Sequence, residues 1–470
     1  MAKNRNVEFN AFALLVMVIR NTHSIKIEYI CYFLDRNMPN ANRFSLINPS
    51  KFSFFYGYVI LVIGSIGVLA SIPGQTIGVS VFTDPVKDAL GLTRNQFSNA
   101  YMLGTLLSSF FVARAGILFD RFGARYVAFF AAFLLGVSLL LSSISVEISE
   151  TSKSILNSNS WIIPFILMCL LFFGIRFCGQ GVLTMSSRNM LMMWFDRNRG
   201  KVNAISSITV SLGFSSAPIF ISKLIDNNGW QLSWRILALS LFVFSIFIIQ
   251  FYRNNPEDFG LKPDGNIKKT KTVKTLKVET NFTLNEAKKT RAFWMIGLAL
   301  AFNSFFITGF SFHVVSIFGS HDYSKSQAIA VFLPISIIAI FVSTLCNVLS
   351  DYIHHKIYLY IMLCAGILAS FGLLILHNTM GVYMLILGLG ILGGLFAVVN
   401  AVTWPRYYGK KFLGSITGKV MSFLVIASAI APSLFSYFFT TLGSYSYISY
   451  ITLAFLLFLI IGSIKVKNPQ

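Results

Sequence analysis

The sequence has little charge, and acidic residues are the scarcer of its charged types. Only 12% of the 470 residues are charged, and 17 acids stand against 38 lysines and arginines. Soluble domains carry about 25% charged residues. A soluble fold of this length could not remove a chain that is 55% hydrophobic from water. The composition therefore excludes an ordinary cytosolic enzyme and a nucleic-acid-binding protein, in spite of the net charge of +21.

Cysteines and catalytic clusters are also scarce. The five cysteines show no metal-ligand spacing, and four of them lie in apolar runs, where free buried thiols are common. The apolar segments hold no His/Cys/Asp cluster, no phosphate-binding glycine loop and no carboxylate pair. We therefore expect no enzyme activity, no metal site and no cofactor.

Long apolar runs, by contrast, fill most of the chain. A helix that crosses a bilayer needs about 20 apolar residues, and a helix satisfies its own backbone in lipid. Runs of this length lie at 56–80, 96–118, 124–146, 161–187, 202–223, 233–252, 292–318, 326–350, 357–377, 381–404, 414–440 and 443–464. The sequence therefore predicts an all-α, multi-pass membrane protein with 12 transmembrane helices.

Lysine and arginine gather in every second loop between these runs. Cytoplasmic loops carry such an excess, so both termini are expected on the cytoplasmic side of the inner cell membrane. The expected organisation is an N-terminal cytoplasmic segment (1–54), a six-helix bundle (55–252), a basic linker (253–291), a second six-helix bundle (292–464) and a tail (465–470). Met38 opens a short polar lead into the first run, which makes 1–37 a candidate mis-annotated start.

The two halves resemble each other in sequence. Arg94 and Gln96 align with Lys325 and Gln327, and Pro218 later aligns with Pro432 in a shifted register. The shift is explained by a longer outer loop after the third run, at 144–160. Two similar bundles around a central site are a recurring transporter architecture, although a repeat alone also suits a channel or a scaffold. Within the linker, 283–290 is typical of a short capped helix.

One motif follows the second apolar run. Residues 116–125 read GILFDRFGAR, in which Gly116 allows two helices to approach closely and Gly123 allows a tight turn. The motif resembles the signature after the second helix of the major facilitator superfamily. The second copy, 347–356, keeps Asp351. The resemblance implies a transporter that works by alternating access, with gating residues Gly116, Asp120, Arg121, Gly123, Arg125 and Asp351.

The same resemblance gives Asp120 a partner. It implies that the carboxylate lies near the start of the eleventh helix, about Ser415 to Gly418, when the cytoplasmic side is closed. A helix N-terminus attracts an anion, and a contact present in one conformation biases the equilibrium between two. The alternative is an ion pair with Arg121, Arg125 or Arg188 that orders the loop.

Three longer stretches narrow the resemblance. Residues 55–105, 176–206 and 406–420 are similar to the oxalate/formate antiporter and monocarboxylate transporter branches of the superfamily, which implies a small organic anion as cargo. The chain departs from the family pattern in the fourth helix. The usual motif is R-x-x-Q-G, whereas one extra residue separates Arg176 from Gln180 here.

Arg176 lies in the middle of an apolar run, where charge is costly and normally faces a cavity or a partner. No acidic residue falls at the same depth, so an anionic substrate is one candidate counter-ion. The alternative is a structural post, in which Arg176 is tied to carbonyl groups and Gln180. Both interpretations stay open.

Other polar residues in cavity-lining runs complete the candidate substrate site. With Arg176 and Gln180, the expected substrate-binding residues are Gln75, Asn303, His313 and Asn400, and Thr76, Thr308 and Thr403 lie beside them. His313 is also a candidate carrier of a co-transported proton. Polar side chains in spans often only join helices, which is the alternative for each of them.

The sequence as a whole predicts a monomeric secondary transporter of a small, monocarboxylate-like organic anion in a lipid bilayer. An exporter of amphipathic, drug-like compounds is the alternative, because an aromatic-rich cavity with one arginine suits such cargo. A non-transporting receptor or scaffold is the remote alternative. No nucleic-acid partner is expected.

Overall fold

The computed structural model describes residues 47–265, 280–350 and 352–470. All regular secondary structure in these ranges is helical, as the sequence predicted. Ten of the described helices are long and apolar enough to cross a membrane. The segment 1–37, which the sequence makes a candidate mis-annotated start, and the predicted gating residue Asp351 lie outside the described residues.

Two of these helices contain more residues than one crossing of a bilayer needs. Helix α6 (Arg94–Ser143) has 50 residues and α10 (Arg199–Phe251) has 53, whereas one crossing needs about 20. Each is broken at a glycine with left-handed φ, 79° at Gly123 and 76° at Gly229. The count of ten is lower than the predicted twelve because each of these two helices joins two arms across such a break.

The first half contains shorter elements around these two. They are η1 (Pro49–Lys51), α3 (Gly57–Ala70), η2 (Ile72–Gly74), α4 (Thr76–Ser80), α5 (Thr83–Ala89), α7 (Ser145–Ile155), α8 (Ile162–Ile175), η3 (Arg176–Leu183) and α9 (Thr184–Trp194). Helix α7 occupies the segment that the sequence predicted as an outer loop. Pro73 interrupts the first predicted span, because proline lacks the amide hydrogen that an α-helix needs.

The linker and the second half are more regular. They comprise η4 (Glu257–Phe259), α11 (Leu284–Lys289), α12 (Arg291–Gly319), α13 (Lys325–Ala330), α14 (Phe332–Leu349), α15 (His355–Leu374), α16 (Thr379–Tyr408), α17 (Leu413–Leu442) and α18 (Ser446–Ser463). The predicted short helix at 283–290 is confirmed as α11. Thr283 and Glu286 form a capping box at its start, in which each side chain accepts the other's backbone N–H.

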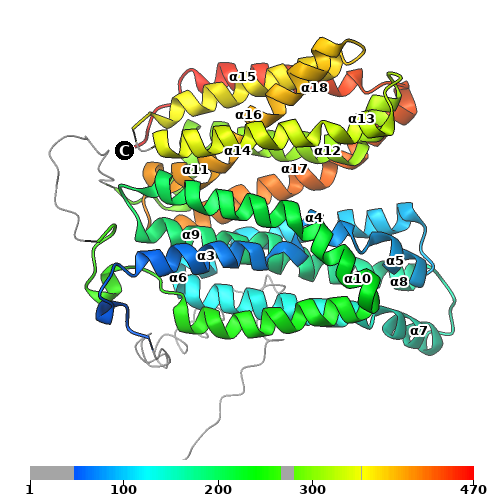
Figure 1. Cartoon of the computed structure of the whole chain (residues 1–470), viewed down its shortest axis with the longest axis horizontal. Coiled ribbons are helices and arrows are strands. Elements are labelled where there is room, and N and C mark those ends of the chain that lie inside the picture. The colour runs from blue at the N-terminus through cyan, green and yellow to red at the C-terminus, as the bar shows by residue number, and fades with distance from the viewer. Residues whose placement is uncertain (1–46, 266–279, 351) are drawn as a thin grey trace, which may run out of the picture. The chain divides into compact units, whose positions relative to one another are not determined.

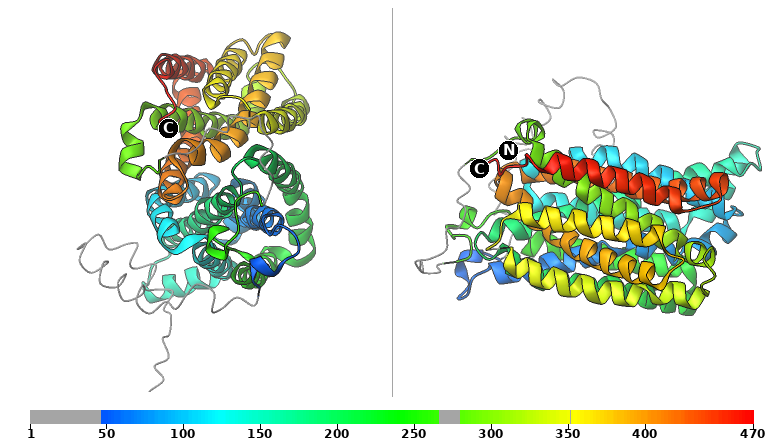
Figure 2. Two further views of the ribbon diagram at one scale, coloured as in Figure 1. Left: turned by 90° about the vertical axis from the view of Figure 1, so that its left-hand side faces the viewer. Right: turned by 90° about the horizontal axis from the view of Figure 1, so that it is seen from above.

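The helices run roughly along one common direction (Figure 1, Figure 2). The two arms of α6 have different neighbours. In the first arm, a Cβ on Gly116 would lie 2.1 Å from the carbonyl oxygen of Gly414 in α17. In the second arm, the Arg125 side chain donates to the carbonyl of Ile249 near the end of α10. The first arm therefore joins the two halves, and the second packs inside the first half.

Candidate functional site

The extra residue in the fourth-helix motif has a structural counterpart. Residues Arg176–Leu183 form a π-helix, η3, between the α-helices α8 and α9. A π-helix takes up one more residue per turn than an α-helix, and such segments are frequent at functional sites. The residue inserted between Arg176 and Gln180 is therefore absorbed locally, without rotating α9 away from its neighbours.

The π-helix holds Arg176 in the interior of the protein. The residue is 1% exposed, and its Nη1 donates to the Gly74 carbonyl oxygen at 3.0 Å. Its guanidinium carbon lies 5.1 Å from the centre of the Tyr101 ring, within the range of a cation–π contact. Its other two nitrogens, Nε and Nη2, are buried without a hydrogen-bond partner in the described part of the chain. A buried cation thus keeps two donors available.

Polar side chains of the first half gather next to this arginine. Gln75 follows the broken helix at Gly74 and donates to the hydroxyls of Ser71 and Thr184, each at 3.0 Å. The hydroxyl of Tyr101 lies 2.9 Å from that of Thr76. Sequence reasoning missed Tyr101, because nothing local distinguishes it from other aromatic residues in an apolar helix. Only the packing of α6 against η3 places it over a cation.

The candidates from the second half lie apart from this group. His313 Nε2 is 2.9 Å from the Pro432 carbonyl oxygen, so this nitrogen carries a hydrogen and donates. Asn303 is buried and Asn400 half-buried. None of the three forms a hydrogen bond with Arg176 in the described ranges. Thr403 is fully buried and bonded to His355, so it joins helices and does not face a cavity.

Asp120 lies at the contact between the two halves. Its two carboxylate oxygens accept the backbone N–H groups of Gly414 and Ser415, at 2.6 and 2.7 Å. These amides belong to the first turn of α17, where unpaired N–H groups and the helix dipole favour an anion. Such a contact contributes about 0.3–1 kcal/mol, and up to about 2 kcal/mol when partly buried.

The rest of the motif shapes the turn between the arms of α6. A Cβ on Gly123 would lie 2.0 Å from the side-chain amide nitrogen of Asn254, so only glycine fits there. Asn254 also accepts the backbone N–H of Arg125. Arg125 is buried against α10, whereas Arg121 is exposed beside Phe122. The motif therefore divides into one part that faces the other half and one that closes a turn.

Further bonds join the halves at the end where Asp120 lies. Lys410 pairs with Asp196 at 2.9 Å and donates to the Met193 carbonyl at 2.7 Å. Burial and the nearby Arg199 lower the pKa of Lys410, and Asp196 acts in the opposite direction. The side chain of Asn189 donates to Thr417, Asn203 donates to Asn347, and both bonds cross between the halves. These contacts hold the halves together at this end.

Comparison with known proteins identifies the family. The model of the Major Facilitator Superfamily matches residues 55–432. The chain belongs to this superfamily. The predicted membership is thereby confirmed. The narrower resemblance to the oxalate/formate and monocarboxylate branches stays a prediction.

Curated relatives match part of the chain. The MFS transporter asaE of Aspergillus flavus is 30% identical over 153 residues, which are 32% of this chain and 30% of that protein. MFS-type transporter 1 of an Ophiocordyceps species is 29% identical over 133 residues, which are 28% of this chain and 26% of that protein. The matches therefore span less than a third of either relative.

Solved structures share the fold over most of the chain. The proton:xylose symporter XylE has a TM-score of 0.59 at 16% identity, covering 87% of this chain and 94% of its own. A bacterial homologue of the iron transporter ferroportin in an outward-facing state has a TM-score of 0.60 at 14% identity, and the match covers 86% of this chain and 98% of that chain. The human organic anion transporter MFSD10 has a TM-score of 0.56 at 14% identity, and the match covers 87% of this chain and 99% of that chain. At these identities the likeness establishes the fold alone.

Proposed function

We propose that this superfamily member is a secondary transporter that moves a small, monocarboxylate-like organic anion by alternating access. The observation that carries the proposal is Arg176, a buried cation with two donors that have no partner among the described residues. An arginine binds a carboxylate through two parallel N–H···O bonds. A carboxylate here would satisfy both free nitrogens and neutralise a charge that is otherwise costly to bury.

The surroundings of Arg176 favour a substrate role over a structural one. A structural post would spend its donors on carbonyl groups, but only Nη1 does so, toward Gly74. Gln180 does not satisfy the arginine either, since its Oε1 is itself buried without a partner in the described ranges. Gln75, Gln180 and Tyr101 would complete the substrate site around the carboxylate.

The topology we propose has twelve crossings, with one crossing for each arm of α6 and α10. An arm of roughly 25 residues is about 37 Å long, which suits a hydrocarbon core of about 30 Å. The excess of lysine and arginine in alternate loops places both termini and the linker on the cytoplasmic side of the inner cell membrane. The domain boundaries follow, with bundles at 55–252 and 292–464.

In this topology the contacts at Asp120 form the cytoplasmic gate. Gly116, Asp120 and α17 close that side, and Gly123, Arg121 and Arg125 support the turn. Because the carboxylate meets the start of α17 only when the halves touch, the contact stabilises the state that is closed to the cytoplasm. A monomer holds the whole pathway, since the gate residues come from both halves of one chain.

The proton is the candidate co-transported ion, and His313 is its candidate carrier. Its Nε2 is directed at the Pro432 carbonyl oxygen of α17, which fixes the orientation of the ring. Asn303 and Asn400 belong to the same half and would contact the cargo once the halves move. Replacing His313 with glutamine should abolish pH dependence of flux without abolishing binding.

An exporter of amphipathic compounds is the second candidate function. It is favoured by a set of aromatic rings on α6, α8 and η3: Phe173 lies 5.5 Å from Phe111 and 5.8 Å from Phe177, measured between ring centres. Amphipathic cations or neutral compounds would pack on these rings and make no use of Arg176.

Ligand-induced thermal stabilisation of the purified protein separates the two functions. A ligand that binds the folded state at 100 times its Kd adds about 2.7 kcal/mol. We expect one small carboxylate to raise the melting temperature of the wild type and not that of Arg176→Gln. Arg176→Lys, which keeps the charge but not the paired donors, should bind more weakly. Stabilisation by amphipathic compounds alone, unchanged in Arg176→Gln, would overturn the anion proposal.

A further inference from the structure

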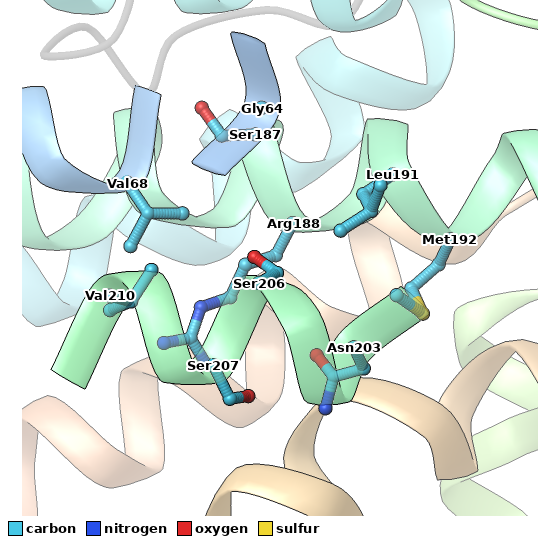
Figure 3. Close-up of a pocket in the computed structure, with 10 residues that line it drawn as sticks. All are labelled: Gly64, Val68, Ser187, Arg188, Leu191, Met192, Asn203, Ser206, Ser207 and Val210. Atoms are coloured by element: carbon cyan, nitrogen blue, oxygen red, sulfur yellow. The ribbon is translucent and has the colours of Figure 1, made fainter. Parts of the chain in front are cut away.

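A second arginine lies on the same helix as Arg176, closer to the Asp120 end. Arg188 belongs to α9, twelve residues beyond Arg176 and thus roughly 18 Å farther along the helix. Figure 3 shows its side chain reaching from α9 toward the first arm of α10, into a pocket between α3, α9 and α10. The described residues offer it no hydrogen bond and no ion pair.

The walls of this pocket are polar where the guanidinium enters. Ser206 and Ser207 of α10 lie beside it (Figure 3), and Ser187 and Asn203 also line the pocket. Ser206 already accepts from Ser65, and Ser187 bonds to Tyr252, so both are held in place. A half-buried cation that has no partner among the described residues, in a pocket with hydroxyl groups, suits an anion.

We propose that Arg188 forms a second, sequential binding site for the transported carboxylate, between Arg176 and the gate. This inference rests on the proposed function. The separation of roughly 18 Å is too large for one small carboxylate to reach both arginines at once, so the anion occupies the two sites in turn. Arg188 is then the cation that receives cargo from the side of Asp120 or releases it there.

The pocket is closed in the present conformation and is built to open with the gate. It has about 10 Å³ of free space, which is room for about one water molecule and not for a carboxylate. Asn203, one of its walls, donates to Asn347 and to the Ala397 carbonyl of the other half. Separation of the halves at this end breaks those bonds and uncovers Arg188.

The first test compares binding with flux. In liposomes of neutral phosphatidylcholine, Arg188→Gln should lower carboxylate counterflow about tenfold, the usual effect of losing one charge-assisted hydrogen bond. The Kd from thermal stabilisation should change less than twofold, because Arg176 still binds the anion. Arg188→Lys should recover most of the flux. Arg114→Gln, which removes an exposed cation from the same half, is the matched control and should leave both unchanged.

The second test isolates the site. With Arg176→Gln and Asp120→Asn combined, the first site is removed and the gate is loosened, and weak, saturable stabilisation by millimolar carboxylate should remain. Adding Arg188→Gln should abolish it. Wild-type flux in Arg188→Gln, residual stabilisation in the triple variant, or stabilisation only by anionic lipid would each overturn the inference. Absence of carboxylate binding to the wild type would instead reject the proposed function itself.

Discussion

The two halves of the molecule have similar helices but different interiors. The register that aligns Gly200 with Gly414 places Arg188 on Val402, which is fully buried in α16. The corresponding helix of the second half is a continuous α-helix of 30 residues, without the π-helix of the first. At this aligned position the first half therefore has a cation and the second half has an apolar side chain.

The loop after α9 in the first half and the loop after α16 in the second half occupy corresponding positions. They carry opposite charges at one aligned position, and they bind each other there. The same register aligns Asp196 with Lys410, and these two form the ion pair between the halves. The linker holds both loops in the same way. Asp264 accepts the N–H groups of Asp196, Arg197 and Asn198, and Asn281 accepts those of Lys410 and Lys411. The backbones of the two loops are thus held by the linker in the same way, although their aligned side chains, Asp196 and Lys410, have opposite charge.

The largest effect on transport is expected from adding a side chain where the backbones of the two halves approach most closely, at Gly116 and Gly414. In Gly116→Ala the new methyl group would lie 2.1 Å from the Gly414 carbonyl, and backbone cannot yield as a flexible side chain can. Transport in liposomes should fall by about a hundredfold. Gly393→Ala is the control, since its nearest neighbour is the Ala339 methyl at 3.8 Å. Equal activity of the two variants would disprove a rigid contact at Gly116.

Removal of the extra residue between Arg176 and Gln180 would make the fourth helix a continuous α-helix, as its counterpart α16 is in the second half. Deleting Cys178 should convert η3 into an α-helix and rotate Arg176 relative to Gly74 and Tyr101. We expect carboxylate binding to weaken at least tenfold while the protein remains folded, measured by thermal stabilisation and by size-exclusion chromatography. Unchanged affinity would mean that the π-helix does not orient the arginine.

Loss of the gate charge should shift the balance between conformations. Asp120→Asn keeps the shape but loses most of the attraction to the start of α17, worth about 1–2 kcal/mol, or roughly tenfold in population. The measurement is the labelling rate of Ser207→Cys in a cysteine-free background, which should rise about tenfold. A rate equal to that with Asp120 present would show that the carboxylate does not bias the gate.

The smallest effect is expected at the ion pair between the loops. Lys410→Ala should loosen the same end by about 0.2–1 kcal/mol, because Asp196 is half exposed and water screens the pair. The exchanged pair Asp196→Lys with Lys410→Asp should restore part of the loss in a double-mutant cycle. Additive effects in that cycle would show that the two charges do not interact.

Much of the architecture could be predicted from local patterns. Apolar runs of sufficient length indicate helices that cross a membrane, and the capping residues of α11 mark its start. The breaks in α6 and α10 also agree with the sequence, because Gly123 and Gly229, whose backbone angles are non-helical, fall between separate predicted runs. The outer helix α7 was missed because a polar segment of that length is also typical of a loop.

The residues of the candidate site could be proposed from local signals, but their arrangement could not. Arg176 stood out because charge is rare in an apolar run, and Asp120 because it belongs to the motif at 116–125, and both signals are local. Tyr101 over the arginine and Lys410 at Asp196 gave no such signal, since their partners lie on distant parts of the chain. For Thr403 the sequence left two alternatives open, because only packing decides whether a polar residue faces a cavity or another helix.

The sequence by itself determined that this is a helical, multi-pass membrane protein with the superfamily motif, a repeated organisation and an arginine, Arg176, inside an apolar run of its first half. These features follow from composition, periodicity and a local motif, which act over a few residues. The tertiary structure alone decided which donors of Arg176 remain free, which amides Asp120 meets and that Arg188 enters a pocket. Those outcomes depend on how helices that are far apart in the chain pack together, and the residues of one segment alone do not determine that packing.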